Sequence, residues 1–371
     1  MSTLFETTAI KGMVLKNRLV RSATWEGMSD KDGRPTEKMI DLYRNLALGG
    51  IGLIISGYAF VRPDGKQLPY QMGIHTDDFA DDYRKLTDAV HDSGGIIALQ
   101  MVHVGGQTST DTIGRQPLAP SAIKVDQFTE LPAALSKAEI GDLLQAFGDG
   151  ARRAKAWGFD AVQLHGAHGY LINQFLSPLT NVRTDEYGGN LENRCRFLME
   201  AYKKVRETVG ADYPVLIKLN AMDNLAGGLE IDGVLYAAKK LSDEGIDAIE
   251  VSAGTPASGD KSPVREKINK QEREAYNLDP ARKIKASVAC PVMVVGGFRS
   301  FEIAEKAVAE NGMDYISLSR PLIREPDLPN RWTGSDRQPA RCISCNKCFR
   351  PGVQGEGIYC VVEKMAREKT G

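Results

Sequence analysis

Short apolar runs alternate with amphipathic stretches along most of the chain. The apolar runs predict strands over residues 18–23, 52–56, 96–101, 160–164, 215–219, 248–252, 292–295 and 315–319. Between them, helical spacing of apolar residues predicts helices over residues 37–48, 79–92, 137–157, 191–209, 232–244, 279–287 and 300–310. Gly, Pro or Asp flanks many of the strands, as short connections between strands and helices require.

This alternation predicts one α/β architecture. Strands separated by helices favour a parallel sheet that is covered by helices. No GxGxxG turn follows the first strand, so we expect a closed (β/α)8 TIM barrel rather than a doubly wound sheet. Two long non-helical insertions, residues 105–132 and 253–277, follow the third and sixth strands. They would lie at the carboxyl ends of the strands, where barrel enzymes receive their substrates.

Composition narrows the class of protein. The chain has 371 residues, 42% of them hydrophobic and 26% charged, with a formal net charge of −1. A nearly neutral globular composition gives no reason to expect nucleic acid or an acidic membrane surface as a partner. The N-terminus has no basic segment before a long apolar one, and no run of about 18 apolar residues occurs. We therefore expect a cytoplasmic protein.

Cysteines divide the chain into two parts. Residues 1–335 form the predicted barrel, and residues 336–371 form a short C-terminal cysteine-rich extension that holds Cys342, Cys345, Cys348 and Cys360. A disulfide scaffold would spread its pairs through the fold, whereas two C-x-x-C steps near one end favour metal or cluster ligation. Four thiolates satisfy a 4Fe-4S cluster or tetrahedral zinc. Unligated thiols are the third alternative.

The residues that follow the fourth predicted strand carry the strongest chemical signal. His165, His168 and Tyr170 lie within six residues and are separated by two glycines and an alanine. An imidazole can donate a hydrogen bond to a developing oxyanion, and a phenol can supply a proton. We expect these three side chains to be catalytic rather than packed in a structural loop.

Other strand ends suggest a phosphorylated planar cofactor. Barrels often bind phosphate after the seventh and eighth strands, where this chain has Gly296, Gly297, Phe298, Ser319 and Arg320. Lys218, at the end of the fifth strand, would place positive charge where a reduced flavin ring accumulates negative charge. Gln100 offers both a donor and an acceptor to a pyrimidine edge. The alternatives are a tight glycine turn, a lysine that reaches solvent and a structural amide.

These segments resemble the old yellow enzyme family of FMN-dependent ene-reductases, including the N-terminal barrel of 2,4-dienoyl-CoA reductase. The resemblance spans about residues 4–330. Its most specific part is the segment HGAHGYLINQFLSPLTNVRTDEYGG, followed by Glu192, Asn193 and Arg194. Shorter matches are KNR at residues 16–18, GLII at 52–55, LQ at 99–100, GGF at 296–298 and SRPL at 319–322.

The resemblance implies a function. Bound FMN would be reduced by NAD(P)H and oxidised by the C=C bond of an α,β-unsaturated carbonyl or acyl substrate. His165 and His168 would bind the substrate carbonyl, and Tyr170 would protonate the α-carbon. The FMN would contact Ala23, Thr24, Tyr58, Gln100 and Lys218 at its ring, and Gly297, Phe298, Ser319 and Arg320 at its phosphate.

The chain departs from the family pattern at several positions. Lys218 replaces the usual arginine, so a point charge replaces a planar two-pronged donor. Trp25 stands where relatives often have a smaller Thr or Cys, and it would narrow the substrate pocket. Tyr58 stands where a small residue often lines the flavin. In the dienoyl-CoA reductase branch an iron–sulfur cluster occupies the tail, with three residues between its second and third cysteines where this chain has two.

The sequence is compatible with two other functions. One is an amine-dehydrogenase-like flavoenzyme, and the other is a flavin and cluster electron-transfer protein that works with a separate partner protein. The pair of histidines favours a carbonyl oxygen over a cationic amine as ligand. The sequence is compatible with an oligomer and does not specify the substrate.

Overall fold

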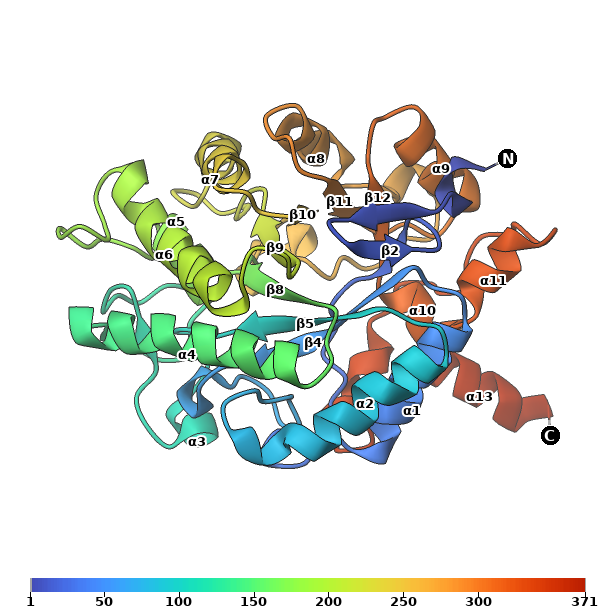
Figure 1. Ribbon diagram of the computed structural model, residues 1–371, viewed down its shortest axis with the longest axis horizontal. Coiled ribbons are helices and arrows are strands. Elements are labelled where there is room, and N and C mark those ends of the chain that lie inside the picture. Colours follow the sequence, from blue (N-terminus) through green and yellow to red (C-terminus); the bar gives the residue numbers. More distant parts are fainter. Residues whose placement is uncertain (1, 371) are drawn as a thin grey trace.

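Eight strands close into one parallel barrel at the centre of the computed structural model, which describes residues 2–370 (Figure 1). They are β3 (Leu19–Arg21), β4 (Leu53–Phe60), β5 (Ile97–Val102), β8 (Ala161–Gly166), β9 (Val215–Asn220), β10 (Ala248–Ser252), β11 (Val292–Val295) and β12 (Tyr315–Leu318). Each strand pairs with the next along the chain, and β12 pairs with β3 to close the barrel, with Ile316 opposite Leu19. The predicted (β/α)8 barrel is confirmed.

Helices surround the strands (Figure 1). They are α1 (Glu37–Leu48), α2 (Ala80–Asp92), α4 (Lys137–Ala156), α6 (Leu191–Val209), α7 (Ile231–Asp243), α8 (Leu278–Lys285) and α9 (Phe301–Ala309). Their ends lie within two residues of the predicted ones. The start of α4 shows why: Ser136 and Glu139 form a capping box, in which each side chain bonds to the backbone N–H of the other residue.

A short antiparallel hairpin that the apolar pattern did not predict precedes the barrel. It consists of β1 (Thr8–Ile10) and β2 (Met13–Leu15). Its side chains Ile10 and Leu15 are fully buried and belong to the same cluster as the interior residues Leu53 and Ala98. The hairpin therefore extends the core inside the barrel and leaves the other end to the site.

The two long insertions are largely irregular, but the prediction that they lack helices was wrong in part. The first contains α3 (Thr110–Ile113) and the strand β6 (Leu118–Ala119), which pairs with β7 (Ala133–Ala134). The second contains two 3-10 helices, η4 (Pro256–Lys261) and η5 (Gln271–Arg273). Such one- or two-turn elements are too short to give a periodic apolar pattern.

Short helices complete the chain. The 3-10 helices η1 (Thr3–Phe5), η2 (Pro63–Gly65), η3 (Asp77–Phe79) and η6 (Lys347–Phe349) join the longer elements. After β8 comes α5 (Leu171–Leu176), and after β12 come α10 (Arg320–Arg324), α11 (Leu328–Thr333), α12 (Arg350–Val353) and α13 (Val361–Thr370). No helix in the described part of the chain is long and apolar enough to cross a membrane.

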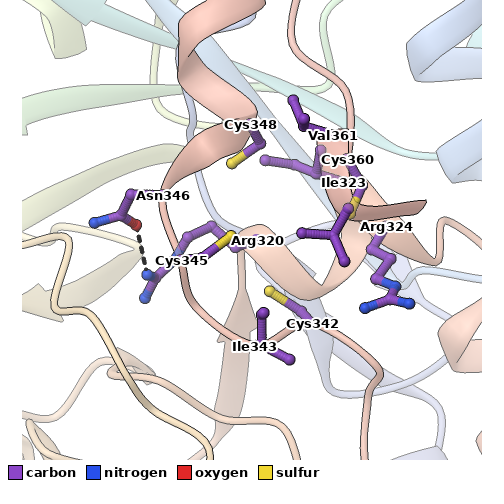
Figure 2. Close-up of a pocket in the computed structure, with 11 residues that line it drawn as sticks. Arg320, Ile323, Arg324, Cys342, Ile343, Cys345, Asn346, Cys348, Cys360 and Val361 are labelled. Atoms are coloured by element: carbon purple, nitrogen blue, oxygen red, sulfur yellow. Dashed lines mark hydrogen bonds between the residues drawn. The ribbon is translucent and has the colours of Figure 1, made fainter. Parts of the chain in front are cut away.

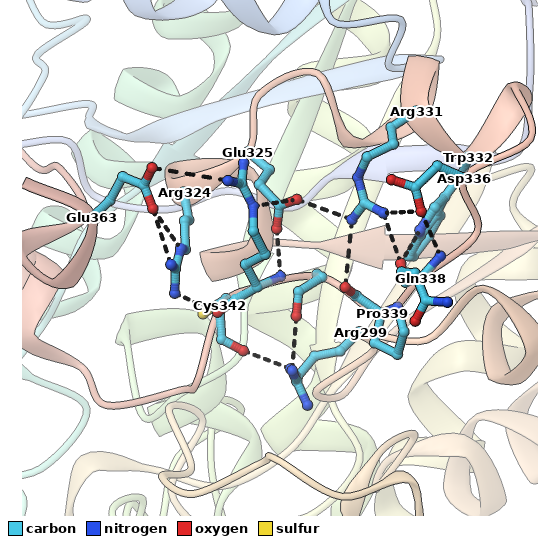
Figure 3. A network of polar contacts seen from close by, with 12 residues as sticks. Arg299, Arg324, Glu325, Arg331, Trp332, Asp336, Gln338, Pro339, Cys342 and Glu363 are labelled. Atoms are coloured by element: carbon cyan, nitrogen blue, oxygen red, sulfur yellow. Dashed lines mark hydrogen bonds and ion pairs between the residues drawn. The ribbon is translucent and has the colours of Figure 1, made fainter. Parts of the chain in front are cut away.

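An ion-pair network fastens the C-terminal tail to the barrel (Figure 3). The Glu325 carboxylate is buried and pairs with Arg331 Nη2 at 2.9 Å and with Arg341 Nε at 3.0 Å. Arg324 pairs with Glu363 of α13 at 3.0 Å, and Arg299 donates to the carbonyl of Cys342 at 2.6 Å. The division at residues 335 and 336 stays a prediction, and its outer ends, residues 1 and 371, lie outside the described residues.

Candidate active site

A strained turn after β8 presents the three predicted catalytic residues. His168 has a φ of 60° and Gly169 a φ of 75°, both in the left-handed region. The turn is held by α5, because Asn173 Oδ1 accepts from the Gly169 N–H at 2.6 Å and Gln174 Nε2 donates to the Gly169 carbonyl at 2.6 Å. The asparagine and glutamine of the long motif therefore position this turn.

The structure brings His165, His168 and Tyr170 together. The His165 ring centroid lies 4.7 Å from that of Tyr170 and 5.0 Å from that of His168. His168 and Tyr170 line a cavity of about 380 Å³ at the carboxyl ends of the strands. His165 is buried and lies outside the residues that line this cavity.

Both imidazoles are neutral near pH 7. Burial, followed by the neighbouring His168 and Lys218 side chains, holds the pKa of His165 well below its usual range. Burial, followed by Lys218, lowers the pKa of His168 to about 3. His165 Nδ1 accepts from the Ala167 N–H at 3.3 Å, which leaves the proton of the neutral ring on Nε2. His168 Nε2 lies 2.7 Å from Ser252 Oγ, so its tautomer depends on that hydroxyl.

The central cavity collects most of the residues predicted at the strand ends. Those that line it are Ala23, Thr24, Trp25, Tyr58, His168, Tyr170, Lys218 and Ser319. Trp25, the predicted pocket residue, also packs its indole against Gly352 of the tail, where an added Cβ would lie 2.9 Å from the ring. The tail itself supplies Phe349 and Val353 to the cavity wall, which the sequence did not indicate.

Gln67 is a cavity residue that the sequence reasoning missed. Its Oε1 accepts from the Tyr170 hydroxyl at 2.7 Å and from the Tyr58 hydroxyl at 3.0 Å. The available signal was position alone, because Gln67 follows the second barrel strand at its carboxyl end.

A buried polar chain lies around Lys218. Its Nζ is 3.3 Å from Glu250 Oε2 and donates to Ser22 Oγ at 2.9 Å. Burial lowers the pKa of Lys218, and the neighbouring Glu250 carboxylate opposes that shift. Glu250 also accepts from Gln163 Nε2 at 3.0 Å, and Gln163 Oε1 accepts from Gln100 Nε2 at 2.6 Å. The sequence reasoning did not single out Glu250 or Gln163, because both stand inside runs interpreted only as apolar strands.

The residues predicted to bind the phosphate do not all lie at the central cavity. Of that set, only Ser319 lines the central cavity, and its Oγ lies 2.7 Å from Thr24 Oγ1. Gly296 and Gly297 lie against Tyr276, and the Phe298 side chain is buried in the core. Arg320 reaches toward the tail, where it donates to Asn346 Oδ1 at 2.7 Å.

The four tail cysteines border one small pocket, which Arg320 and Asn346 also line (Figure 2). All four are free thiols. Burial raises the pKa of Cys342, and it raises that of Cys348 to about 12. Within the described residues, no group of three or more His, Cys, Asp or Glu side chains is arranged to hold a metal ion.

Comparison with known proteins identifies the family. The model of the NADH:flavin oxidoreductase / NADH oxidase family matches residues 3–336. The chain belongs to this family. Among its curated relatives, an NADPH dehydrogenase of Halalkalibacterium halodurans is 37% identical and is aligned over 88% of this chain and 92% of its own length. An NADH oxidase of Thermoanaerobacter brockii is 37% identical over 98% of this chain, which spans only 56% of that oxidase.

Solved structures of NADH:flavin oxidoreductase relatives agree. A 2-naphthoyl-CoA reductase complex superimposes with a TM-score of 0.90 at 29% identity, covering 97% of this chain and 56% of that one. An old yellow enzyme homologue from Zymomonas mobilis superimposes with a TM-score of 0.76 at 31% identity. The match covers 89% of this chain and 92% of that one. Histamine dehydrogenase from Rhizobium sp. 4-9 superimposes with a TM-score of 0.87 at 26% identity. The match covers 97% of this chain and 52% of that one. The predicted resemblance to the old yellow enzyme family is confirmed.

The FMN expected in this family fits the residues present. Gln100 Oε1 is buried and has no hydrogen-bond partner among the described residues, so an acceptor is available to a flavin edge. The backbone N–H groups of Gly297, Phe298 and Ser319 donate no hydrogen bond within the described part of the chain. Free N–H donors near the ends of β11 and β12 suit a phosphate.

Proposed function

We propose that this chain is an FMN-dependent ene-reductase that uses NAD(P)H to reduce the C=C bond of an α,β-unsaturated carbonyl or acyl compound. The observation that carries the proposal is that Tyr170, His168 and Lys218 line one cavity at the carboxyl ends of the barrel strands. A proton donor, a neutral imidazole and a cation are the groups that such a reduction requires.

Each group has a defined task in this proposal. FMN, when bound, supplies the hydride chemistry, and Lys218, Gln100, Thr24, Ser319 and the free N–H groups after β11 hold it. His168 is neutral and lines the cavity, so it donates a hydrogen bond to the substrate carbonyl and stabilises the negative charge that develops there. His165, the second predicted donor, lies buried beside His168 and outside the cavity lining. Burial raises the pKa of Tyr170 to about 12, so its hydroxyl keeps its proton at pH 7 and can give it to the substrate α-carbon.

Tyr170→Phe tests this assignment. The variant removes the proton donor and keeps the ring, so we expect flavin reoxidation by cyclohexenone to slow by about 10²- to 10⁴-fold. Flavin reduction by NADH or NADPH needs no proton from Tyr170 and should be unchanged. Rapid-mixing absorbance measurements separate the two half-reactions. Unchanged reoxidation would remove Tyr170 from its catalytic role.

For the tail we infer a 4Fe-4S cluster in preference to zinc. A cluster binds each cysteine through a different iron, so it needs four sulfurs around a cavity, whereas zinc needs them around a point. The four cysteines border one shared pocket, and this arrangement supports the cluster. Absorption spectra and metal analysis of anaerobically purified protein test it, and zinc without iron would contradict it.

The amine-dehydrogenase-like alternative and the electron-transfer alternative share the same tail. The likeness to histamine dehydrogenase keeps the first in view. A cluster would also let electrons pass to a separate partner protein. Bleaching of the flavin by histamine, or an enone reaction that does not need Tyr170, would favour these alternatives. The six cysteines, all free of disulfides, suit a reducing compartment such as the cytoplasm.

A further inference from the structure

Two phenols meet at a single amide in the central cavity. Tyr58 comes from β4 and Tyr170 from the turn after β8, and their ring centroids are 5.6 Å apart. Both hydroxyls donate to the same oxygen of Gln67, at 3.0 Å and 2.7 Å. Both tyrosines are more than nine-tenths buried. One of these hydroxyls is the reacting group of the proposed function, and the other belongs to Tyr58, whose ring was predicted to contact the flavin but whose hydroxyl has no assigned task.

The segment that carries Gln67 is fixed to the strand that carries Tyr58. Gln71 is buried, and its Oε1 accepts from the N–H groups of Gln67 at 2.8 Å and Leu68 at 3.2 Å. Its Nε2 donates to the Tyr58 carbonyl at 3.1 Å. A second buried amide therefore holds the first one in place, so the position of Gln67 between the phenols is determined by the fold.

We propose that Tyr58 and Gln67 are positioning residues that make Tyr170 a stronger acid, by donating hydrogen bonds to its oxygen as it loses its proton. This inference rests on the proposed function and names how its acid is activated. The Tyr170 O–H bond breaks, its proton forms the new C–H bond at the substrate α-carbon, and the electron pair stays on the phenolate oxygen. Water from the cavity mouth later returns a proton to that oxygen.

Tyr58 and Gln67 can both become hydrogen-bond donors to the Tyr170 oxygen when Tyr170 loses its proton. A phenol hydroxyl rotates about its C–O bond, so Tyr58 can turn its O–H from Gln67 to the Tyr170 oxygen. An amide offers an acceptor oxygen and a donor nitrogen, so a half-turn of Gln67 replaces the acceptor by a donor. Hydrogen bonds to the charged form of a group favour that form, and they are stronger than bonds between neutral groups.

The directions of the pKa shifts of Tyr170 and Tyr58 are consistent with these roles. Burial raises the pKa of Tyr170 to about 12, while its hydrogen-bonding interactions with Tyr58 and Gln67 lower it. Burial is also the largest cause that raises the pKa of Tyr58. Tyr58 thus keeps its proton and acts as a donor. The other titratable groups around Tyr170 are His165 and His168, with ring centroids at 4.7 Å and 6.5 Å, and Lys218 of the same cavity pairs with Glu250.

A double-mutant cycle on the FMN-loaded enzyme tests the proposal. Flavin reoxidation by cyclohexenone is measured for the parent, Tyr58→Phe, Tyr170→Phe and the double variant, in H₂O and D₂O. We expect Tyr58→Phe to slow reoxidation about tenfold and to raise the solvent isotope effect, because a weaker acid makes proton transfer limit the rate more strongly. Flavin reduction by NADH or NADPH should not change.

In the Tyr170→Phe background, adding Tyr58→Phe should change the rate less than about twofold, since the group on which it acts is gone. Gln67→Met keeps the length of the side chain without the amide, and it should behave like Tyr58→Phe. Tyr83→Phe is a matched control. The buried Tyr83 hydroxyl donates to the Gly73 carbonyl at 2.7 Å, and neither residue lines the cavity. The control variant should leave both half-reactions unchanged.

The outcomes separate this inference from the proposed function. A parental reoxidation rate in Tyr58→Phe overturns the inference, and so does an equal slowing with and without the Tyr170 hydroxyl, which would mean that Tyr58 acts on flavin or substrate directly. If Tyr170→Phe itself reoxidises normally, the proposed acid is wrong and the inference falls with it. Slowing by both single variants without further slowing in the double variant supports both.

Discussion

At the scale of single residues, the buried imidazoles make the site sensitive to acid. The pKa of His168 is about 3 in the folded chain, mainly because of burial, against about 6.5 for an exposed histidine. As pH falls below about 6.5, His168 binds a proton in the unfolded chain but not in the folded chain. Stability is therefore fully present above that pH and declines toward pH 3, by up to about 1.4 kcal/mol per pH unit for this group.

His168→Asn should reduce this decline. Urea unfolding of parent and variant at pH 7 and pH 5, at one fixed FMN concentration, gives the two slopes of unfolding free energy against pH. We expect the slope of the variant to be shallower by up to about 1.4 kcal/mol per pH unit, which corresponds to the uptake of one proton. Tyr170→Phe alters the same cavity without removing an imidazole and should keep the parental slope. Equal slopes for all three proteins would contradict the prediction.

What the sequence revealed of the site depended on the kind of residue. Tyr170, His168 and Lys218 stand out because their chemistry is unusual at strand ends, and the structure places them in one cavity. Glu250 was hidden by its neighbours, since one carboxylate inside an apolar strand does not change the pattern. Gln67 was hidden because its two partners are 9 and 103 residues away, and no local rule connects them.

At the scale of elements, the tail depends on one buried carboxylate. Glu325 accepts from Arg331 and Arg341, and its side chain is almost fully buried. In Glu325→Gln an uncharged amide replaces the charge that both guanidinium groups face, so we expect a loss of about 2 kcal/mol in unfolding free energy. Faster proteolytic release of the tail should accompany the loss.

Glu310→Gln is the matched control for this prediction. Glu310 pairs with Lys306 at 3.8 Å on the surface, where an ion pair contributes about 0.5 kcal/mol or less. Urea unfolding and limited proteolysis should therefore separate the two variants clearly. Equal stability of both variants would mean that Glu325 does not hold the tail.

Long periodic elements followed from the sequence, and short ones did not. The helices α1 and α6 begin and end at the predicted residues, because each shows several turns of apolar spacing. The hairpin β1–β2 has two strands of three residues each, too few for a two-residue alternation to show. The helices α5, α10 and α12 have six residues or fewer, and tertiary contacts fix them.

At the scale of the whole molecule, the tail and the barrel share the central cavity. Phe349 and Val353 of the tail line it together with Trp25 and Tyr58 of the barrel. The N–H of Ile358 donates to the Glu26 carbonyl at 2.8 Å and continues the contact beside Trp25. Contacts between residues more than 300 positions apart leave no trace in local sequence pattern, so the sequence could place the cysteines in a tail but not the tail over the pocket.

This arrangement makes the tail a determinant of substrate size. Phe349→Ala removes an aromatic ring from the cavity wall, so enones with bulky substituents should gain access relative to cyclohexenone. We expect the ratio of kcat/KM for bulky over small enones to rise about tenfold, the range that a few methylene-sized contacts control in apolar pockets. Met365→Ala removes an exposed side chain of α13 and should leave the ratio unchanged. If both variants keep the parental ratio, the tail does not shape the substrate pocket, and its place beside the cavity serves the cysteine site alone.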